Sequence, residues 1–299
     1  MDWRSSIIGF KNYLQLERSL SGNSIDAYVR DIEKFTQFLE VQNNNKSIND
    51  IKLQDLEEFI GWINELGMSA RSQARVISGI KAFYKYLLLE DLVIDDPTQL
   101  IETPKLGEKL PIVLSYEEVQ TLIDNIDLSK PEGERNKAML ETLYGCGLRV
   151  TELTTLKISN LNVNAGFSKV LGKGDKERLV PIGEQALKQI AIYRENIRSH
   201  LNIKPGNEDI LFLNRRGAML SRVMVFTIIK DLARKIGLKK NISPHTFRHS
   251  FASHLIEGGA NLRAIQEMLG HESITTTEIY THLDKEYLRD TILQYHPRS

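Results

Sequence analysis

Apolar residues recur every three or four positions along most of the chain, which is the spacing that gathers them on one face of a helix. In the first ninety residues the pattern breaks at three polar or glycine-containing positions: Ser21-Gly22, Asn43 to Asn45 and Gly67. Four helices are therefore predicted between residue 2 and about residue 92, with Ser24 and Ser69 as N-caps. The predicted buried stripes contain Ile25, Tyr28, Val29, Ile32, Phe35, Leu39, Val76, Ile80, Phe83, Tyr84 and Leu87.

A polar stretch bounded by prolines follows this helical segment. Residues 104–111 run Pro-Lys-Leu-Gly-Glu-Lys-Leu-Pro, and the prolines favour extended backbone over helix. We therefore predict a first domain over residues 1–103, a linker over 104–111 and a second domain over 112–299. Ser115 and Glu118 have the spacing of a capping box, which predicts the first helix of the second domain.

Helical spacing continues through the second domain, with one interruption that alternates like a β-hairpin. Two strands are predicted over residues 167–171 and 178–182, joined by a turn at 172–177 that is rich in glycine and charge. Helices are predicted around residues 134–145, 151–157, 183–199, 221–236, 245–257, 261–269 and 273–282. The predicted fold class is mainly α, with a small β-hairpin in the second domain.

Length and composition bound the class of protein. At 299 residues and 41% apolar content, the chain is long enough for two domains with separate cores. We expect no membrane span and no signal peptide, because the apolar runs fall short of the roughly 18 residues that a span needs and the opening residues lack a signal core. The single cysteine, Cys146, excludes an internal disulfide and fits a reducing, cytoplasmic setting.

The formal net charge is zero, but the charge is unevenly distributed. Residues 1–110 hold 13 Lys and Arg against 17 Asp and Glu, whereas residues 111–299 hold 26 against 22. A nucleic-acid partner would therefore meet a local basic patch and not a strongly basic protein. Arg71, Arg75 and Lys85 lie off the apolar stripe of the fourth helix, and both contact with DNA phosphate and ordinary solvation are open for them.

Arg149 and Lys173 are suited to binding an anion. Arg149 precedes the predicted helix that contains Glu152, where helix-start amides and a guanidinium both favour a phosphate group. The alternative is a structural capping arginine, and in either case we interpret Glu152 as its orienting partner. Lys173 lies in the hairpin turn, where it either reaches toward a DNA groove or is simply solvated. Cys146, between two glycines, is interpreted as a packing residue and not as a nucleophile.

An imidazole and a guanidinium are predicted to share one helical face, because His245 and Arg248 are three residues apart. The opposite face is predicted to be buried through Phe247, Phe251 and Leu255. His245 and His249 also have the i, i+4 spacing of a zinc-binding helix. The glutamate of that zinc motif is replaced by Thr246, and Arg248 between the histidines would repel a dication, so a metal site is disfavoured. The histidines interpreted as structural or exposed are His249, His254 and His282.

Two further polar residues lie near the end of the chain. The helix predicted at 261–269 is capped by Asn261 and ends at Gly270, so that His271 follows its last turn directly. Its inward-facing residues are predicted to be Leu262, Ile265, Met268 and Leu269. Tyr280 lies in the next predicted helix, where a core aromatic residue is the simpler interpretation. What favours a role in chemistry is a complete set of groups for metal-free phosphodiester exchange: Arg149, Lys173, His245, Arg248, His271 and Tyr280.

Four sequence blocks resemble the tyrosine recombinase (phage integrase) family, and the length and linker are similar to its Xer subgroup. The blocks are Gly-Cys-Gly-Leu-Arg-Val-Thr-Glu-Leu (145–153), Gly-Lys-Gly-Asp-Lys-Glu-Arg (172–178), His-Thr-Phe-Arg-His-Ser-Phe-Ala-Ser-His (245–254) and Leu-Gly-His-Glu-Ser-Ile-Thr-Thr-Thr-Glu-Ile-Tyr-Thr-His (269–282). The resemblance covers nearly the whole chain. It implies an N-terminal, SAM-like, core-binding domain of four helices and a mainly helical catalytic domain that together close around DNA.

The resemblance also implies a mechanism that consumes no metal, cofactor or ATP. Tyr280 would attack the scissile phosphate and form a 3′-phosphotyrosyl link, with His245 accepting its proton. Arg149 and Arg248 would stabilise the transition state, Lys173 would protonate the departing 5′-oxygen, and His271 would bind a non-bridging oxygen. The tentative DNA-binding residues are Arg71, Arg75 and Arg222, of which Arg222 matches a family position that faces the major groove.

The implied partners are a double-stranded DNA recombination site, a homo- or hetero-tetramer of related recombinases on paired sites, and a septal DNA translocase (FtsK-like); no membrane partner is implied. The implied role is resolution of chromosome or plasmid dimers at cell division. Three alternatives stay open: an integrase or transposase of a mobile element, a DNA-relaxing enzyme, and an inactive architectural DNA-binding protein. A zinc hydrolase is a further alternative. The tail 284–299 carries an apolar stripe, which would dock either on its own domain or on a neighbouring protomer.

Overall fold

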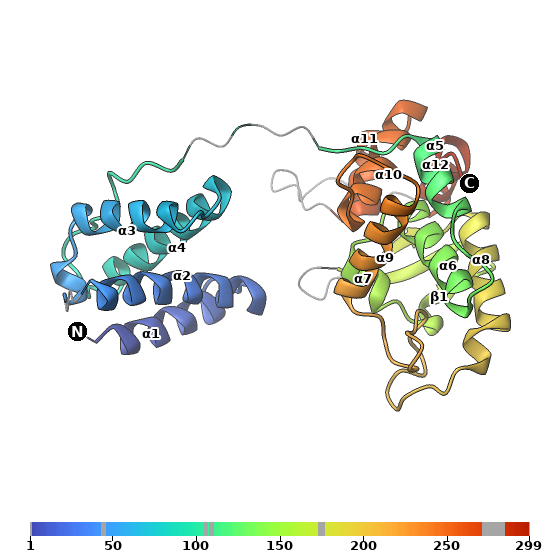
Figure 1. Ribbon diagram of the computed structural model, residues 1–299. Coiled ribbons are helices and arrows are strands. Elements are labelled where there is room, and N and C mark those ends of the chain that lie inside the picture. Colours follow the sequence, from blue (N-terminus) through green and yellow to red (C-terminus); the bar gives the residue numbers. More distant parts are fainter. Residues whose placement is uncertain are drawn as a thin grey trace. The chain divides into compact units, whose positions relative to one another are not determined.

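The computed structural model divides into two compact units, Met1–Lys109 and Leu110–Ser299 (Figure 1). The structure describes all residues except 1, 43–45, 105–106, 108–110, 173–176, 271–284 and 299, and for 285–287 only the backbone. Among the described helices, none has the length and apolar character that crossing a membrane requires.

The first unit consists of four helices: α1 (Trp3–Leu16), α2 (Gly22–Val41), α3 (Leu53–Glu65) and α4 (Ala70–Leu89). The prediction of four helices is confirmed. Ser69 caps α4 as predicted, since its hydroxyl accepts a hydrogen bond from the backbone N–H of Ser72 at 3.3 Å. The prediction for Ser24 is wrong, because α2 begins at Gly22 and the N-cap position belongs to Ser21.

Aromatic rings fill the core of the first unit, where α2 and α4 pack together and α1 packs on both. Ring centroids lie 5.2 Å apart for Phe10 and Phe83, and 5.1 Å apart for Phe35 and Phe59, both pairs with edge-to-face geometry. The predicted stripe residues are buried, apart from Tyr28 and Val29, which are half-buried. Packing of this kind stabilises the unit independently of the rest of the chain.

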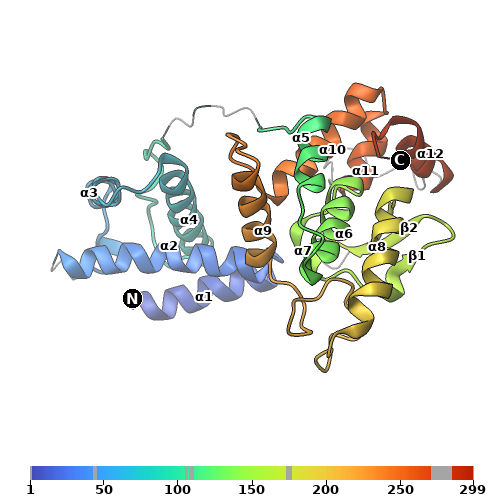
Figure 2. The same cartoon turned by 45° about the vertical axis from the view of Figure 1, so that its right-hand side comes forward.

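The second unit is also mainly helical, and Figure 2 shows the small sheet at the edge of the unit, beside α8. Its helices are α5 (Tyr116–Asp124), α6 (Pro131–Gly145), α7 (Val150–Thr154), α8 (Glu184–Asn196), α9 (Arg222–Lys235), α10 (Pro244–Gly258), α11 (Leu262–Leu269) and α12 (Lys285–Tyr295). Ser115 and Glu118 form the predicted capping box at the start of α5. Helix α6 packs against α8 and α10 and forms the centre of the core.

The sheet has three antiparallel strands in the order β1-β2-β3: β1 (Leu161–Asn162), β2 (Phe167–Leu171) and β3 (Glu177–Pro181). Phe167 pairs with Pro181 and Leu171 pairs with Glu177, which confirms the predicted hairpin within one residue. Strand β1 was not predicted, because two residues are too few to produce a recognisable alternation. Short 3₁₀ turns follow α7 at Ile158–Asn160 and α8 at Arg198–His200.

Helices α10 and α11 carry the segments with the predicted chemistry. Phe247, Phe251 and Leu255 on α10 are fully buried, as their spacing predicted. Asn261 caps α11 and Gly270 ends it in the left-handed conformation, with φ +64°. Leu262 was predicted to face inward, but it is exposed, because the buried face of α11 is formed by Ala264, Ile265, Met268 and Leu269. The helix predicted at 273–282 lies outside the described residues.

Candidate active site

Arg149 stands at the junction of α6 and α7. Helix α6 ends at Gly145, and the chain turns at Gly147 with φ +57°. A Cβ at position 147 would lie only 2.4 Å from Cδ1 of Phe251, so a glycine is required both for the turn and for the close approach of α10. Arg149 then takes the N-cap position of α7, and its backbone N–H donates to Oε2 of Glu152 at 2.7 Å.

Arg248 approaches the same junction from α10. Its side chain is buried, and its Nη1 donates to the carbonyl oxygen of Gly147 at 2.8 Å, while Nη2 donates to the carbonyl oxygen of Leu269. Burial and the neighbouring Arg149 lower the pKa of Arg248 to about 10. The guanidinium therefore keeps its charge at neutral pH.

A buried carboxylate, that of Glu152, lies between the arginines, with a side chain only 2% exposed. Nη1 of Arg149 donates to Oε1 of Glu152 at 2.9 Å, and Nη1 of Arg248 lies 3.9 Å from Oε2. A third arginine, Arg178 on β3, donates to both oxygens at 2.7 and 2.8 Å. Burial raises the pKa of Glu152, but the hydrogen bonds from Arg178 and Arg149 outweigh burial and leave that pKa below its ordinary value.

His245 lies one helical turn before Arg248 on α10, and its side chain is exposed. The next histidine on the helix, His249, has its pKa lowered by burial and further by His245 and Arg248. Because it is exposed, the imidazole of His245 is accessible to a substrate that binds at this end of α10. Among the residues that the structure describes, no group of three or more His, Cys, Asp and Glu side chains is placed to hold a metal ion.

Three of the six predicted catalytic residues, Lys173, His271 and Tyr280, lie outside the described residues. The structure brings the other three, Arg149, His245 and Arg248, to one region of the second unit. Glu152 was predicted only as a partner of Arg149, and Arg178 was not predicted as a site residue. The signal for Arg178 was its position in the block 172–178, at the start of the second predicted strand.

The single cysteine and two histidines, His254 and His296, belong to the packing of the second unit. Cys146 is buried, and burial raises its pKa to about 12, which excludes a thiolate nucleophile at neutral pH. The ring Nδ1 of His254 lies 2.7 Å from the hydroxyl of Tyr144 in the core, which confirms a structural role. His296 packs against Tyr144, and burial lowers its pKa to about 3.

The C-terminal helix α12 packs on its own unit. Leu288 and Ile292 enter the core, and α12 contacts α10, α11 and β3. Arg298 forms a buried ion pair with Glu141 of α6, which holds the end of the chain. The structure of the single chain therefore has the tail docked in cis, while exchange of the tail between protomers stays a prediction.

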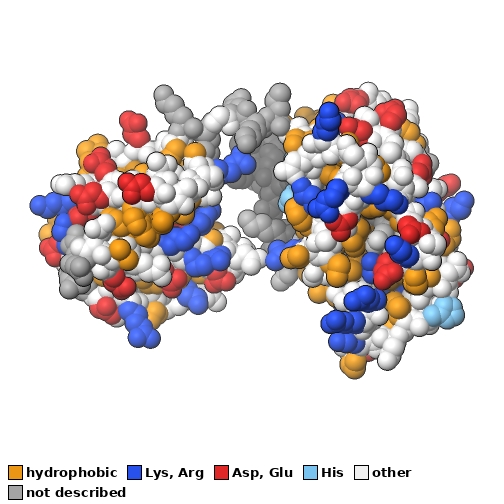
Figure 3. Space-filling view, in the orientation of Figure 1, with side chains coloured by type: hydrophobic (Ala, Val, Ile, Leu, Met, Phe, Trp, Pro, Cys, Tyr) orange, Lys and Arg blue, Asp and Glu red, His pale blue; other side chains and the backbone are white. Residues whose placement is uncertain are grey.

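The predicted DNA-binding residues lie on the surface of the two units. Arg71 is exposed in the first turn of α4, and Arg222 is exposed as the first residue of α9. Arg75 is half-exposed and pairs with Asp31 of α2. Figure 3 shows Lys and Arg side chains interspersed with Asp and Glu on the visible face of each unit, in keeping with the neutral overall charge.

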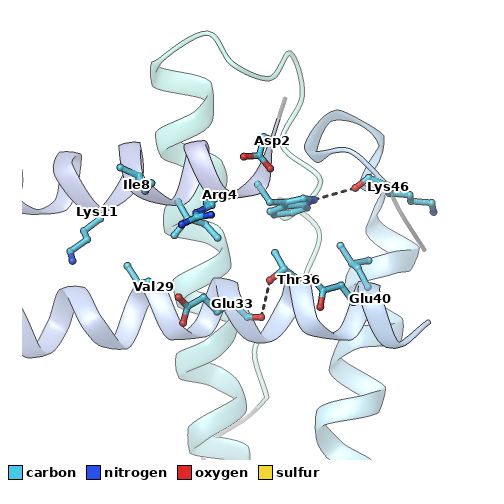
Figure 4. Close-up of a pocket in the computed structure, with 12 residues that line it drawn as sticks. Asp2, Arg4, Ile8, Lys11, Val29, Glu33, Thr36, Glu40 and Lys46 are labelled. Carbon is cyan, nitrogen blue, oxygen red and sulfur yellow. Dashed lines mark hydrogen bonds between the residues drawn. The ribbon is translucent and has the colours of Figure 1, made fainter. Parts of the chain in front are cut away.

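A groove of about 720 Å³ lies between α1 and α2 in the first unit (Figure 4). Arg4 and Lys11 line it from α1, whereas Glu33 and Glu40 line it from α2. Its walls combine both signs of charge with the apolar side chains of Ile8 and Val29. The arrangement does not gather cations around one point, so it is no phosphate site.

Two family models match the chain. The model described as "Phage integrase family" matches residues 113–287, and the model described as "Phage integrase, N-terminal SAM-like domain" matches residues 7–91. A protein named "Tyrosine recombinase XerD" from Staphylococcus epidermidis is 44% identical over 290 residues, which cover 97% of this chain and 98% of that protein. The protein of the same name from Staphylococcus aureus is 43% identical over 97% of this chain and 98% of its own length.

Solved structures agree with these matches. The XerH site-specific recombinase, bound to a palindromic difH substrate in a post-cleavage complex, is 25% identical with a TM-score of 0.69, over 91% of this chain and 80% of that one. A lambda integrase dimer bound to a core site is 16% identical with a TM-score of 0.72, over 95% of this chain and 100% of that one. The second likeness supports the fold alone, which is the predicted mainly helical, two-part architecture.

Proposed function

The chain belongs to the phage integrase family and is a site-specific tyrosine recombinase, and we propose that it cuts and rejoins double-stranded DNA with Tyr280 as its nucleophile. The observation that carries the proposal is the convergence of Arg149 and Arg248 beside the buried Glu152, with the exposed His245 one turn away on α10. Two guanidiniums held in fixed directions are suited to a phosphate whose charge increases during attack.

The proposed chemistry is a transfer of one phosphodiester bond in two steps. In the first step, the Tyr280 oxygen bonds to the scissile phosphorus as the bond to the 5′-oxygen breaks. In the second step, the free 5′-hydroxyl of a partner strand attacks the same phosphorus, and the bond to Tyr280 breaks. Tyrosine has an ordinary pKa of about 10, so a base must accept its proton, and His245 is proposed for that role. Lys173 is proposed to protonate the departing oxygen, and His271 to bind a non-bridging oxygen.

The arginines are proposed to stabilise the five-coordinate transition state. A preorganised donor directed at developing charge is worth on the order of 3 kcal/mol, or about a hundredfold in rate. Because Arg248 and Arg149 already donate to fixed protein oxygens, their orientation costs little when DNA binds. The chain therefore needs no metal ion to balance the phosphate charge.

Around this centre we propose that residues 1–103 form a core-binding domain, joined by the linker 104–111 to a catalytic domain at 112–299. Arg71 and Arg75 are proposed to contact DNA phosphates, and Arg222 at the start of α9 to contact the major groove. The protein is proposed to act in the cytoplasm as a homo- or hetero-tetramer on paired sites, where it resolves chromosome or plasmid dimers. Control by a septal DNA translocase belongs to the same proposal.

A nicked suicide duplex tests the nucleophile. The duplex should carry the recombination site, mapped from the genomic fragments that the protein binds. Loss of a short fragment after cleavage traps the enzyme on DNA, so the native chain should form a covalent adduct and Tyr280→Phe should form none. Tyr116→Phe, in the same unit, is the control and should form the adduct at the native rate. An adduct in the Tyr280→Phe protein would overturn the assignment, whereas binding without any adduct in the native chain would favour an architectural protein.

A further inference from the structure

Arg178 is the second residue of β3, directly after the hairpin turn, and all three of its donor nitrogens are engaged by the protein. Nη1 and Nη2 bind the two oxygens of Glu152 at 2.7 and 2.8 Å, and Nε donates to the carbonyl oxygen of Met268 at 2.9 Å. Its side chain is 13% exposed, against 30% for Arg149. Arg178 is therefore directed at the protein, and Arg149 is the more accessible of the two.

The end of α11 is held by three arginines from three different elements. Arg178 donates to the carbonyl oxygen of Met268, Arg248 to that of Leu269, and Arg149 to that of Gly270 at 3.3 Å. The last carbonyls of a helix have no intrahelical partner and carry partial negative charge, so cations at this end are favourable. The three contacts fix the direction in which the backbone leaves α11 at Gly270, one residue before the proposed phosphate ligand His271.

The turn at Gly270 also restricts the space around Arg178. A Cβ at Gly270 would lie 3.1 Å from Cδ and 3.2 Å from Nε of Arg178, and Gly270 has φ +64°. A side chain at position 270 would therefore force the Arg178 side chain to shift by a few tenths of an ångström, in addition to straining the backbone. The glycine and the arginine form one packed arrangement.

Charge balance gives Arg178 a role beyond packing. Among the described residues, the cluster holds three guanidiniums and one carboxylate, and the carboxylate makes its two-oxygen contact with Arg178. Without Arg178, the negative charge of Glu152 would be balanced by Arg149 and Arg248 alone, and it would compete directly with a DNA phosphate for their donors. With Arg178 present, one positive charge matches Glu152 and two stay available.

We propose that Arg178 is a positioning residue of the recombinase site, which matches the charge of Glu152 and holds the end of α11 so that Arg149 and Arg248 are presented to the scissile phosphate. This inference rests on the proposed function of the site. The test separates the inference from the proposed function. If the proposed function is wrong, the native chain forms no adduct. If only the inference is wrong, the native chain still forms the adduct.

The test measures the single-turnover rate of adduct formation on the nicked suicide duplex, at saturating DNA, for Arg178→Gln and Arg178→Lys. We expect Arg178→Gln to slow the rate about tenfold to a hundredfold, less than the roughly 10²–10³-fold that loss of a direct donor costs. DNA affinity should change far less than the rate. Arg178→Lys restores the charge but not the two-oxygen contact, so its rate should be intermediate.

Two further readouts distinguish positioning from support of the fold. Removal of Arg178 raises the pKa of Glu152, so the acid limb of the rate–pH profile should move to higher pH in Arg178→Gln. In a Glu152→Gln background, the same substitution should add little further loss, because the charge that it balances is gone. Arg198→Gln is the matched control, since Arg198 also donates to backbone carbonyls, those of Glu208 and Ile210, in the same unit.

An Arg178→Gln protein that cleaves at the native rate would overturn the inference. Equal losses in the native and Glu152→Gln backgrounds, with an unmoved acid limb, would also overturn it and would assign Arg178 to folding alone. If Arg178→Gln does not fold, Arg178→Lys carries the same test, and a native rate in that protein contradicts the proposal, because lysine cannot make the two-oxygen contact with Glu152.

Discussion

A buried carboxylate pairs with arginine in each unit, but the two carboxylates differ in the number of donors that they receive. Asp31, in the first unit, accepts from the half-exposed Arg75 through Oδ2, and among the described residues Oδ1 has no hydrogen-bond partner. Glu152, in the second unit, accepts from Arg178 at both oxygens and from Arg149. Burial raises the pKa of Asp31, whereas the donors around Glu152 leave its pKa below the ordinary value.

The difference between Asp31 and Glu152 shows what keeps a buried carboxylate ionised. Burial disfavours a carboxylate in both units, and only a nearly complete shell of donors reverses the effect. In the second unit that shell also orients cations for phosphate chemistry. In the first unit, Asp31 pairs with one half-exposed arginine, Arg75, which is proposed to contact DNA.

The largest effect is expected from Glu152→Gln. A neutral amide leaves three buried or half-buried guanidiniums without a counter-charge, so we expect a loss of about 3–5 kcal/mol in the free energy of unfolding of the second unit, the usual cost of breaking a buried pair. Asp31→Asn is the matched change in the first unit. Because water can solvate Arg75, Asp31→Asn should change the free energy of unfolding of the first unit by no more than about 1 kcal/mol. Urea denaturation of both variants measures the difference, and equal losses would contradict the comparison.

The pH dependence of stability should have opposite signs for the two carboxylates. The folded-state pKa of Glu152 is below 4.5, so its contribution is present above about pH 4.5 and is lost as the pH falls through the lower folded value. The folded-state pKa of Asp31 is above 3.8, so lowering the pH through that raised value relieves a cost of burial and stabilises the folded state.

Denaturation of the native chain against each variant, from pH 7 down to pH 4 and below, separates the two contributions. Relative to Asp31→Asn, the native chain should gain stability on acidification. Relative to Glu152→Gln, it should lose stability at the acid end. If acidification changed the stability in the same direction in both comparisons, the donors around the two carboxylates would not differ in effect.

The smallest effect is expected from Arg75→Ala. If Arg75 contacts one DNA phosphate, the slope of log affinity against log salt should become shallower by about 0.9, the value for one phosphate contact on duplex DNA. The rate of adduct formation at saturating DNA should stay native. Arg71→Ala should behave in the same way, whereas Lys11→Ala, in the groove of the first unit, is a control for a general change in charge. A native salt slope in Arg75→Ala would remove Arg75 from the DNA surface.

Much of the fold follows from local patterns in the sequence. The three- and four-residue spacing predicted the helices, and the glycines at positions 67, 147 and 270 mark turns that need positive φ. The prediction failed where the information is not local. Strand β1 owes its existence to pairing with β2, and the outward position of Leu262 depends on what α11 packs against.

The site was predictable to a similar degree. Residue types and spacing identified Arg149, His245 and Arg248, because their chemistry is recognisable on a helix or at its start. Arg178 was missed because its importance arises from contacts with Glu152, 26 positions away, and Met268, 90 positions away. Apart from its position in the block 172–178, Arg178 has no local signal of this kind. The positions of Lys173, His271 and Tyr280 stay predictions.

The proposal that Arg149 and Arg248 act on the scissile phosphate is tested most directly by the rate of adduct formation in Arg149→Ala. Arg149 is the most accessible arginine of the cluster, and Glu152 keeps its two-oxygen contact with Arg178 when Arg149 is removed, so the fold should persist. At saturating duplex, the account predicts a single-turnover rate at least about a hundredfold below that of the native chain, with a similar unfolding midpoint. A native rate in a correctly folded Arg149→Ala protein would contradict it.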